Sequence, residues 1–132
     1  MVEQLQGTWK STSCEHFEDY MKELGIGRVS RRLGCLAKPT VTISTNGDII
    51  TIKTKSIFTN NEISFKLGEA FEEATPDGHK TKSTITLDND SLMQTQDWNG
   101  KEITITRKLV DGKMVVDSAV NNVTCTRTYE RI

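Results

Sequence analysis

Short runs in which apolar and polar residues alternate fill most of the chain from residue 40 onward. Within 101–109, for example, Ile103 and Ile105 alternate with threonines. A period of two is typical of strands that bury one face. Dipeptides such as Asn46-Gly47, which tolerate the positive φ angles of tight hairpins, separate the runs. The pattern predicts ten strands, at 6–14, 40–46, 49–55, 58–66, 70–74, 79–87, 91–97, 101–109, 113–120 and 123–130.

The connections between these runs are short, so neighbouring strands should pair as antiparallel hairpins rather than through crossover helices. An open sheet of ten strands would expose two edges, and closure removes most of that liability. We therefore expect an all-β fold, a ten-stranded antiparallel up-and-down β-barrel of the clam type. At 132 residues, one domain spanning 1–132 is the natural expectation.

One segment, about 15–37, has helical periodicity instead. Phe17, Tyr20 and Met21 recur at helical spacing behind an acidic first turn. Glycines at 25 and 27 end that helix, a second short helix follows, and Pro39 stops it before the sheet resumes. We expect a two-helix lid between the first and second strands. A nucleic-acid-binding helix-turn-helix is the rival interpretation, but it would leave the rest of the chain without a purpose.

Composition and motifs limit the classes of function. The net charge of −1 and the pI near 6.1 give no basic footprint for nucleic acid. Cys14, Cys35 and Cys125 are odd in number and widely spaced, so we expect neither a disulfide framework nor a zinc site, and a reducing, cytoplasmic setting fits best. The N-terminus shows no secretory signal pattern and no run approaches a membrane span. No catalytic, metal or cofactor motif is found, so we expect a protein that is not an enzyme.

Strand period also assigns faces. Two arginines and a tyrosine fall on apolar faces that should point inward, in strands separated by only one other: Arg107 follows Ile103 and Ile105 and precedes Leu109, while Arg127 and Tyr129 follow Val123 and Cys125. Burying two like charges is costly, and arginine does not lose its proton. A ligand carboxylate would compensate them through bidentate hydrogen bonds. The alternatives are that an arginine faces solvent or is balanced by an internal Glu or Asp.

The interior should be too wide for side chains to fill. About eight strands already give a lumen that side chains can only just pack, and aromatic residues are only 6% of this chain. An apolar cavity with one cationic end is suited to a long-chain fatty acid. The residues expected to line its tail or portal are Phe17, Tyr20, Met21, Val29, Leu33, Pro39, Phe58, Asp77, Ile105 and Val116.

Charge is segregated along the chain. Residues 20–38 contain five basic residues against one acidic residue, and 68–79 contain four acidic residues and no basic one. The basic stretch could be an ordinary solvated helix face. The functional interpretation is a lid surface that meets anionic lipid headgroups during ligand transfer. We expect a monomer with a fatty-acid ligand, transient membrane contact and no nucleic-acid partner.

Five segments resemble the cytosolic fatty-acid-binding proteins, in their heart, adipocyte and myelin branch. They are Gly7–Lys10 (GTWK), His16–Met21 (HFEDYM), Leu36–Thr40 (LAKPT), Glu62–Gly68 (EISFKLG) and Cys125–Glu130 (CTRTYE). The resemblance runs nearly end to end and implies a ten-stranded barrel with a two-helix lid.

The resemblance also implies roles for particular residues. Arg127 and Tyr129 would hold the ligand carboxylate directly, Arg107 would be the second arginine, often acting through water, and Phe58 would lie at the portal. Lys22, Arg31 and Arg32 match a folded nuclear-localisation patch of some relatives, which would add nuclear traffic to a cytoplasmic location. Ser11 departs from the family pattern, which prefers a large apolar residue there.

The predicted function is therefore an intracellular fatty-acid carrier that delivers its ligand between membranes and proteins. A retinoic-acid-type retinoid carrier is the main alternative, since it shares the barrel and the arginine–tyrosine site. A secreted lipocalin would need a signal sequence, and a small hydrolase or isomerase would need a nucleophile–base pair. A membrane-stacking role would need a more basic surface.

Overall fold

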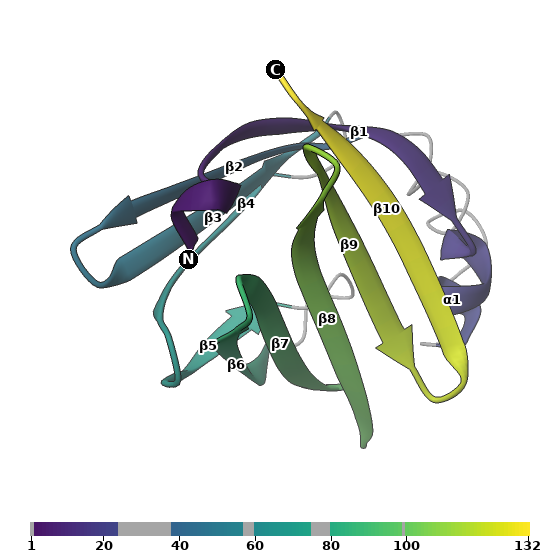
Figure 1. The fold of residues 1–132 in the computed structure, drawn as a ribbon. Coiled ribbons are helices and arrows are strands. Elements are labelled where there is room, and N and C mark those ends of the chain that lie inside the picture. Colours follow the sequence, from purple (N-terminus) through teal and green to yellow (C-terminus); the bar gives the residue numbers. More distant parts are fainter. Residues whose placement is uncertain (1, 24–37, 57–59, 75–79, 99) are drawn as a thin grey trace.

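The computed structural model describes residues 2–23, 38–56, 60–74, 80–98 and 100–132. A short 3-10 helix η1 (Val2–Leu5) precedes the first strand, and one α-helix, α1 (Phe17–Glu23), follows it (Figure 1). The strands are β1 (Gly7–Glu15), β2 (Thr40–Asn46), β3 (Ile49–Lys55), β4 (Asn60–Lys66), β5 (Ala70–Ala74), β6 (Lys80–Asp88), β7 (Ser91–Trp98), β8 (Lys101–Val110), β9 (Lys113–Val120) and β10 (Val123–Arg131).

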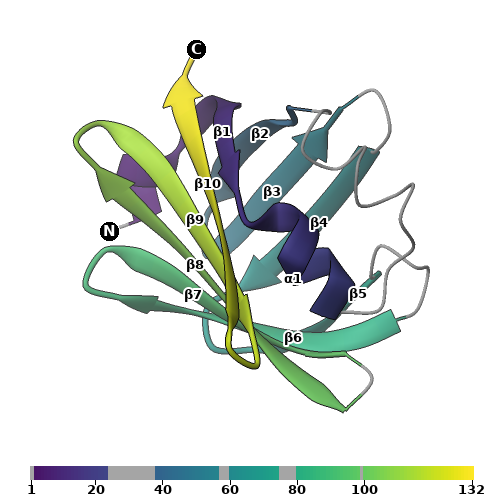
Figure 2. The same cartoon turned by 90° about the vertical axis from the view of Figure 1, so that its right-hand side faces the viewer.

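The ten strands form one antiparallel sheet that curls into a barrel (Figures 1 and 2). Strands that are consecutive in sequence pair along β1–β4 and along β5–β10, and the pairing of β1 with β10 joins the two halves. A register shift between Ser11 and Ser13 lets β1 bend as it passes from β2 to β10. The all-β, ten-stranded antiparallel up-and-down barrel expected from the sequence is confirmed.

The edge strands β4 and β5 are the two ends of the hydrogen-bonded order, although they are neighbours in sequence. Phe65 of β4 and Phe71 of β5 stack across this opening, with ring centroids 5.4 Å apart. The turn between the strands is fixed by the N–H of Gly68, which donates to the carbonyl of Ile85 over 2.8 Å. Aromatic packing thus continues the barrel wall where the strand ladder stops.

The predicted strand ranges agree with the structure to within two residues, because the turn dipeptides limit each strand. The first predicted helix is confirmed as α1. The second predicted helix lies outside the described residues. That the chain is a single domain stays a prediction.

A cluster around η1 closes the end of the barrel away from α1. Leu5 and Trp9 are fully buried, and the indole N–H of Trp9 donates to the carbonyl of Leu5 over 2.9 Å. The guanidinium of Arg131 lies 4.2 Å from the Trp9 ring centroid and donates to the carbonyl oxygens of Gln4 and Gln6. The two ends of the chain therefore hold this end of the barrel together.

Helix α1 lies against the opposite end of β8–β10 (Figure 2). Its inner face buries Tyr20 and Met21 in a cluster with residues of those strands. Two hydrogen bonds fix the last residue of the helix, Glu23. Its carbonyl oxygen accepts one from Lys101 Nζ, and its carboxylate accepts the other from Asn121 Nδ2 over 2.5 Å. A lysine at a helix C-terminus also suits the helix dipole.

Gly7 should be indispensable for this closed end. Its φ is +125°, and a Cβ there would lie 2.5 Å from Nη1 of Arg131. We expect Gly7→Ala to lower the free energy of unfolding by about 3 kcal/mol, through backbone strain and displacement of Arg131. Gly47→Ala is the control, because φ is +65° and nothing lies within 4 Å; it should cost about 1 kcal/mol. Equal losses in urea unfolding would contradict the role given to Arg131.

Candidate ligand-binding site

Arg107 and Arg127 lie on one row of the inner face. Val116 in β9 is directly opposite Arg107 in β8 and also directly opposite Arg127 in β10. Residues directly opposite in antiparallel strands share a face, so both arginines are on the side of the sheet that carries Val116. Tyr129, two residues after Arg127, pairs with the fully buried Met114 and is itself buried. The structure therefore brings the three predicted head-group residues together; their role remains a proposal.

Arg107 donates through Nη1 to Oε1 of Gln94 in β7 over 2.8 Å. Burial lowers the pKa of Arg107, while the charges of Glu73 and Tyr129 act in the opposite direction. The residue nevertheless keeps a partly accessible surface. Arg107 is thus shielded from bulk water but is not fully covered by neighbouring side chains. We expect this combination for a side chain that borders an internal cavity.

Glu73 of β5 is the centre of a polar cluster that the sequence analysis did not identify. Its Oε1 atom accepts from Ser83 Oγ over 2.6 Å, from Gln96 Nε2 over 2.9 Å and from Gln94 Nε2. Ser83 and Gln94 are almost completely buried. A signal was present, because Gln94 and Gln96 occupy the same alternating positions as the buried Leu92. Polar residues at inward positions indicate internal hydrogen bonds.

Arg127 contacts the lid helix. Its guanidinium carbon lies 4.4 Å from the ring centroid of Phe17, the first residue of α1. Cation–π contacts of this kind contribute roughly 0.5–2 kcal/mol. The helix position is thus linked directly to one of the two inner-face arginines.

Of the predicted tail residues that the structure describes, most lie near the helix end of the barrel. Tyr20 and Met21 form a buried cluster with Ile103, Val120 and Cys125, and Phe17 and Ile105 pack against it. Val116 packs against the other core cluster, which contains Tyr129. Pro39 is buried, and its carbonyl accepts from the Ser11 N–H over 3.0 Å. The predicted tail or portal residues that lie outside the described residues are Val29, Leu33, Phe58 and Asp77.

Two hydroxyl or thiol groups in the helix-end cluster are held in their neutral forms. Burial raises the pKa of Tyr20 to about 12, with a further contribution from Cys125. Burial also raises the pKa of Cys125 to about 11. Neither group supplies a nucleophile at neutral pH, because both pKa values lie well above 7.

Leu109 lies on the same face as Arg107, since it is directly opposite the fully buried Met114, but it is 37% exposed because it is next to the β8–β9 turn. The expectation that no cysteine forms a disulfide is wrong. Cys14 is disulfide-bonded, whereas Cys125 is buried and free. Spacing along the chain does not reveal which sulfur atoms a fold brings within bonding distance.

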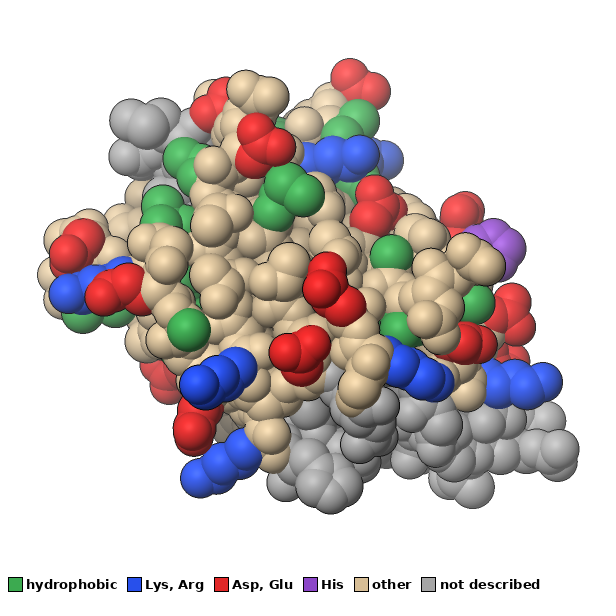
Figure 3. Space-filling view, turned by 90° about the horizontal axis from the view of Figure 1, so that it is seen from below, with side chains coloured by type: hydrophobic (Ala, Val, Ile, Leu, Met, Phe, Trp, Pro, Cys, Tyr) green, Lys and Arg blue, Asp and Glu red, His purple; other side chains and the backbone are tan. Residues whose placement is uncertain are grey.

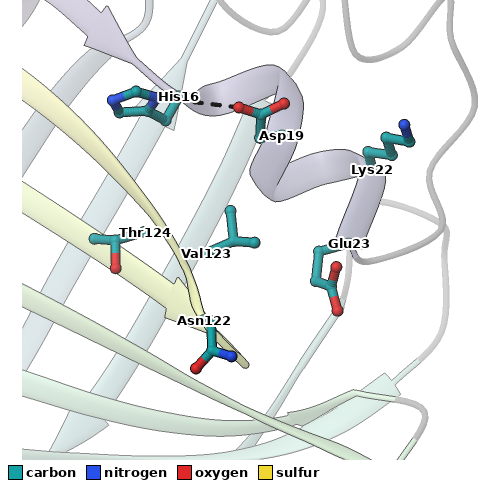
Figure 4. A pocket seen from close by; sticks show the side chains of 7 residues that line it. All are labelled: His16, Asp19, Lys22, Glu23, Asn122, Val123 and Thr124. Atoms are coloured by element: carbon teal, nitrogen blue, oxygen red, sulfur yellow. Dashed lines mark ion pairs between the residues drawn. The ribbon is translucent and has the colours of Figure 1, made fainter.

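The described outer surface has one groove that could be considered as a binding site. A groove between α1 and the β9–β10 turn is lined by His16, Asp19, Lys22, Glu23, Asn122, Val123 and Thr124 (Figure 4). Most of its side chains are polar and exposed, whereas Val123 and Glu23 are half-buried. Seen from below, basic and acidic side chains are interspersed over the described surface (Figure 3).

Within the described part of the chain, His, Cys, Asp and Glu side chains form no group that could hold a metal ion. Among the helices of that same part, none combines the length and apolar character needed to cross a membrane.

Comparison with known proteins agrees with this architecture. Residues 6–132 match the lipocalin / cytosolic fatty-acid binding protein family. The chain is 79% identical to the mouse (Mus musculus) fatty acid-binding protein 12 over 132 residues, covering 100% of both chains. It is 58% identical to the adipocyte fatty acid-binding protein of Pygoscelis papua, covering 99% of both.

A solved structure of the Schistosoma mansoni fatty acid binding protein in complex with arachidonic acid superposes with a TM-score of 0.95. Sequence identity is 33%, and the match covers 99% of this chain and 98% of that one. Both the sequence and the fold thus lead to the same assignment, which confirms the resemblance seen in the five sequence segments. The chain belongs to the lipocalin / cytosolic fatty-acid binding protein family.

Proposed function

We propose that this protein is a carrier, not an enzyme, that holds one long-chain fatty acid inside the barrel. The observation that carries the proposal is the inner-face row in which Arg107 and Arg127 flank Val116, with Tyr129 following on the same face. A carboxylate can accept two parallel hydrogen bonds from a guanidinium and a further one from a phenol. No cofactor or metal is needed for such binding.

The two arginines would have different roles in binding the carboxylate. Arg107 is already hydrogen-bonded to Gln94. Arg127 lies against the Phe17 ring with its face, and the N–H groups of a guanidinium donate in its own plane rather than through that face. Arg127 and Tyr129 are therefore proposed to hold the carboxylate directly, and Arg107 to act through its charge or through water.

The acyl chain would lie among the apolar side chains between this row and the helix end. Ile105 and Val116 lie on the inner face there, and Met21 and Tyr20 project from α1. Ile105 and Val116 keep partly accessible surfaces although they lie on the core side of the sheet. The names of the curated relatives and the arachidonic acid complex of the schistosome protein support a fatty acid.

Delivery to membranes is part of the proposal. Lys22 on α1 and Lys38 before β2 are both exposed, at the same end of the barrel as the lid. Anionic headgroups attract such lysines by about 1 kcal/mol each. We propose a monomeric protein that works in the cytoplasm; the nuclear patch implied by Lys22, Arg31 and Arg32 falls largely outside the described residues.

Arg127→Ala tests the head-group site. The substitution removes a charge-assisted hydrogen bond of about 1.5–3 kcal/mol, so oleate affinity measured by calorimetry should fall more than tenfold while the barrel stays folded. Thr126→Ala is the matched control on the other face, where Thr126 donates to Asp117 over 2.8 Å. It should leave affinity nearly unchanged. Unaltered oleate binding by Arg127→Ala would refute the site.

Competition between oleate and retinoic acid on the same protein separates the two kinds of carrier. The flexible acyl chain should be preferred, since nothing in the described interior selects a rigid polyene. Displacement of bound oleate by equimolar retinoic acid would instead favour the retinoid carrier.

Lys22→Glu tests transfer to membranes. Oleate transfer to vesicles containing anionic lipid should be roughly fivefold slower in the variant, because an attraction becomes a repulsion, and the difference should vanish at high salt. Lys113→Glu is the control, since Lys113 is also exposed but lies beside the β8–β9 turn. Identical slowing by both variants would show that only net charge matters.

A further inference from the structure

The end of β1 places the start of α1 beside one of the inner-face arginines. Cys14, near the end of β1, is directly opposite Arg127 in β10. The chain then turns at His16, whose φ of +59° lies in the left-handed region that non-glycine residues adopt rarely. Helix α1 begins at the next residue, Phe17, and the N–H of Tyr20 donates back to the carbonyl of His16 over 3.1 Å. The backbone itself therefore brings Phe17 close to Arg127.

The ring of Phe17 lies against the face of the Arg127 guanidinium, with the guanidinium carbon 4.4 Å from the ring centroid. A guanidinium donates hydrogen bonds in its own plane, so an aromatic face and hydrogen-bond acceptors can contact it at the same time. The contact with Phe17 is thus compatible with other partners of Arg127 and with a ligand carboxylate at the guanidinium edge. Because the ring limits the tilt of the plane, it also limits the directions in which the N–H groups point.

The position of the Phe17 ring depends in turn on how α1 is docked. Phe17 is half-buried and packs against the helix-end cluster, in which Tyr20 and Met21 are buried. Hydrogen bonds to Glu23 fix the other end of the helix. A displacement of α1 would therefore move the ring away from Arg127, and the two positions are physically linked.

We propose that Phe17 is a positioning residue for the head-group site: its ring holds the Arg127 guanidinium in the orientation that binds a carboxylate, and so couples the docking of α1 to the binding of an anionic lipid. This inference rests on the proposed function, because Arg127 is the group proposed to hold the carboxylate. It gives Phe17 a role beyond the lining of the tail that the sequence predicted.

Such coupling is reciprocal. A carboxylate that orders Arg127 should in turn hold α1 against the barrel. A neutral lipid of the same chain length makes the same tail contacts but has no carboxylate, so it lacks this effect. The difference between an acid and an alcohol of one chain length therefore isolates the contribution of the head group.

Fluorinated phenylalanines at position 17 separate electrostatic attraction from packing. Mono-, di- and trifluorinated rings keep the aromatic shape but withdraw electron density from the ring face step by step. The attraction between the ring and a cation depends on that density, so it weakens at each step. Any change in apolar contact acts equally on the acid and the alcohol and cancels in the ratio of their affinities.

The experiment titrates tetradecanoate and tetradecanol by calorimetry into delipidated protein at pH 8, where the fatty acid is ionised. The affinity for tetradecanoate relative to that for tetradecanol should fall at each step of fluorination, by on the order of fivefold in the trifluorinated protein. The same analogues at Phe71, which stacks on Phe65 with ring centroids 5.4 Å apart, are the matched control. They should leave the ratio unchanged.

Hydrogen exchange at the amides of α1 measures the coupling from the side of the helix. In the wild-type protein, tetradecanoate should slow this exchange on the order of fivefold more than tetradecanol does. In the protein with a trifluorinated ring at position 17, the difference between the two lipids should disappear.

Phe17→Leu is a second variant that needs no unnatural residue. It removes the aromatic face but keeps an apolar side chain, so it should lower the ratio of the two affinities on the order of fivefold. A ratio that changes neither with fluorination at position 17 nor with Phe17→Leu would overturn the inference and leave the proposed function intact, as would an equal fall with fluorination at Phe71. A wild-type protein that does not bind tetradecanoate would overturn the proposed function and the inference with it.

Discussion

Two guanidinium groups lie on the inner face of one sheet, and the polar and aromatic contacts of the interior are arranged around them. Arginine does not escape burial by losing its proton, so each buried guanidinium needs an opposing charge, a polar partner or an aromatic face. Arg107 has the amide of Gln94 and, behind it, the carboxylate of Glu73. Arg127 has the ring of Phe17. These are different solutions, and they make the two arginines unequal.

Strand register is what holds the two groups close together. Because Val116 pairs with both, the spacing between the backbones of the two arginines is set by the strand ladder. A slip of one residue between β9 and either neighbour would send an arginine to the outer face. The bend of β1 matters for the same reason, because it carries Cys14 to the position opposite Arg127 and completes the wall there.

The barrel was predictable because its signals are local. Turn dipeptides such as Asp111-Gly112 limit the strands, and alternation places Arg107, Arg127 and Tyr129 on inward positions. Glu73 was not predicted, since it lies in a short acidic strand that looks solvated in sequence. Its donors come from β6 and β7, and only the pairing of the sheet shows that they converge. The disulfide at Cys14 depends in the same way on distances in space.

The amide between Glu73 and Arg107 has a consequence of its own. A direct ion pair would satisfy both groups and leave little reason for an anion to enter. Gln94 instead transmits hydrogen bonding but keeps the two charges apart, so that Arg107 stays ordered while its field is only partly cancelled. The contact of Arg127 with the Phe17 ring is of another kind, because an aromatic face attracts a cation through its quadrupole rather than through an opposing charge. For the carrier function proposed above, these contacts would hold the two arginines in position before a lipid enters.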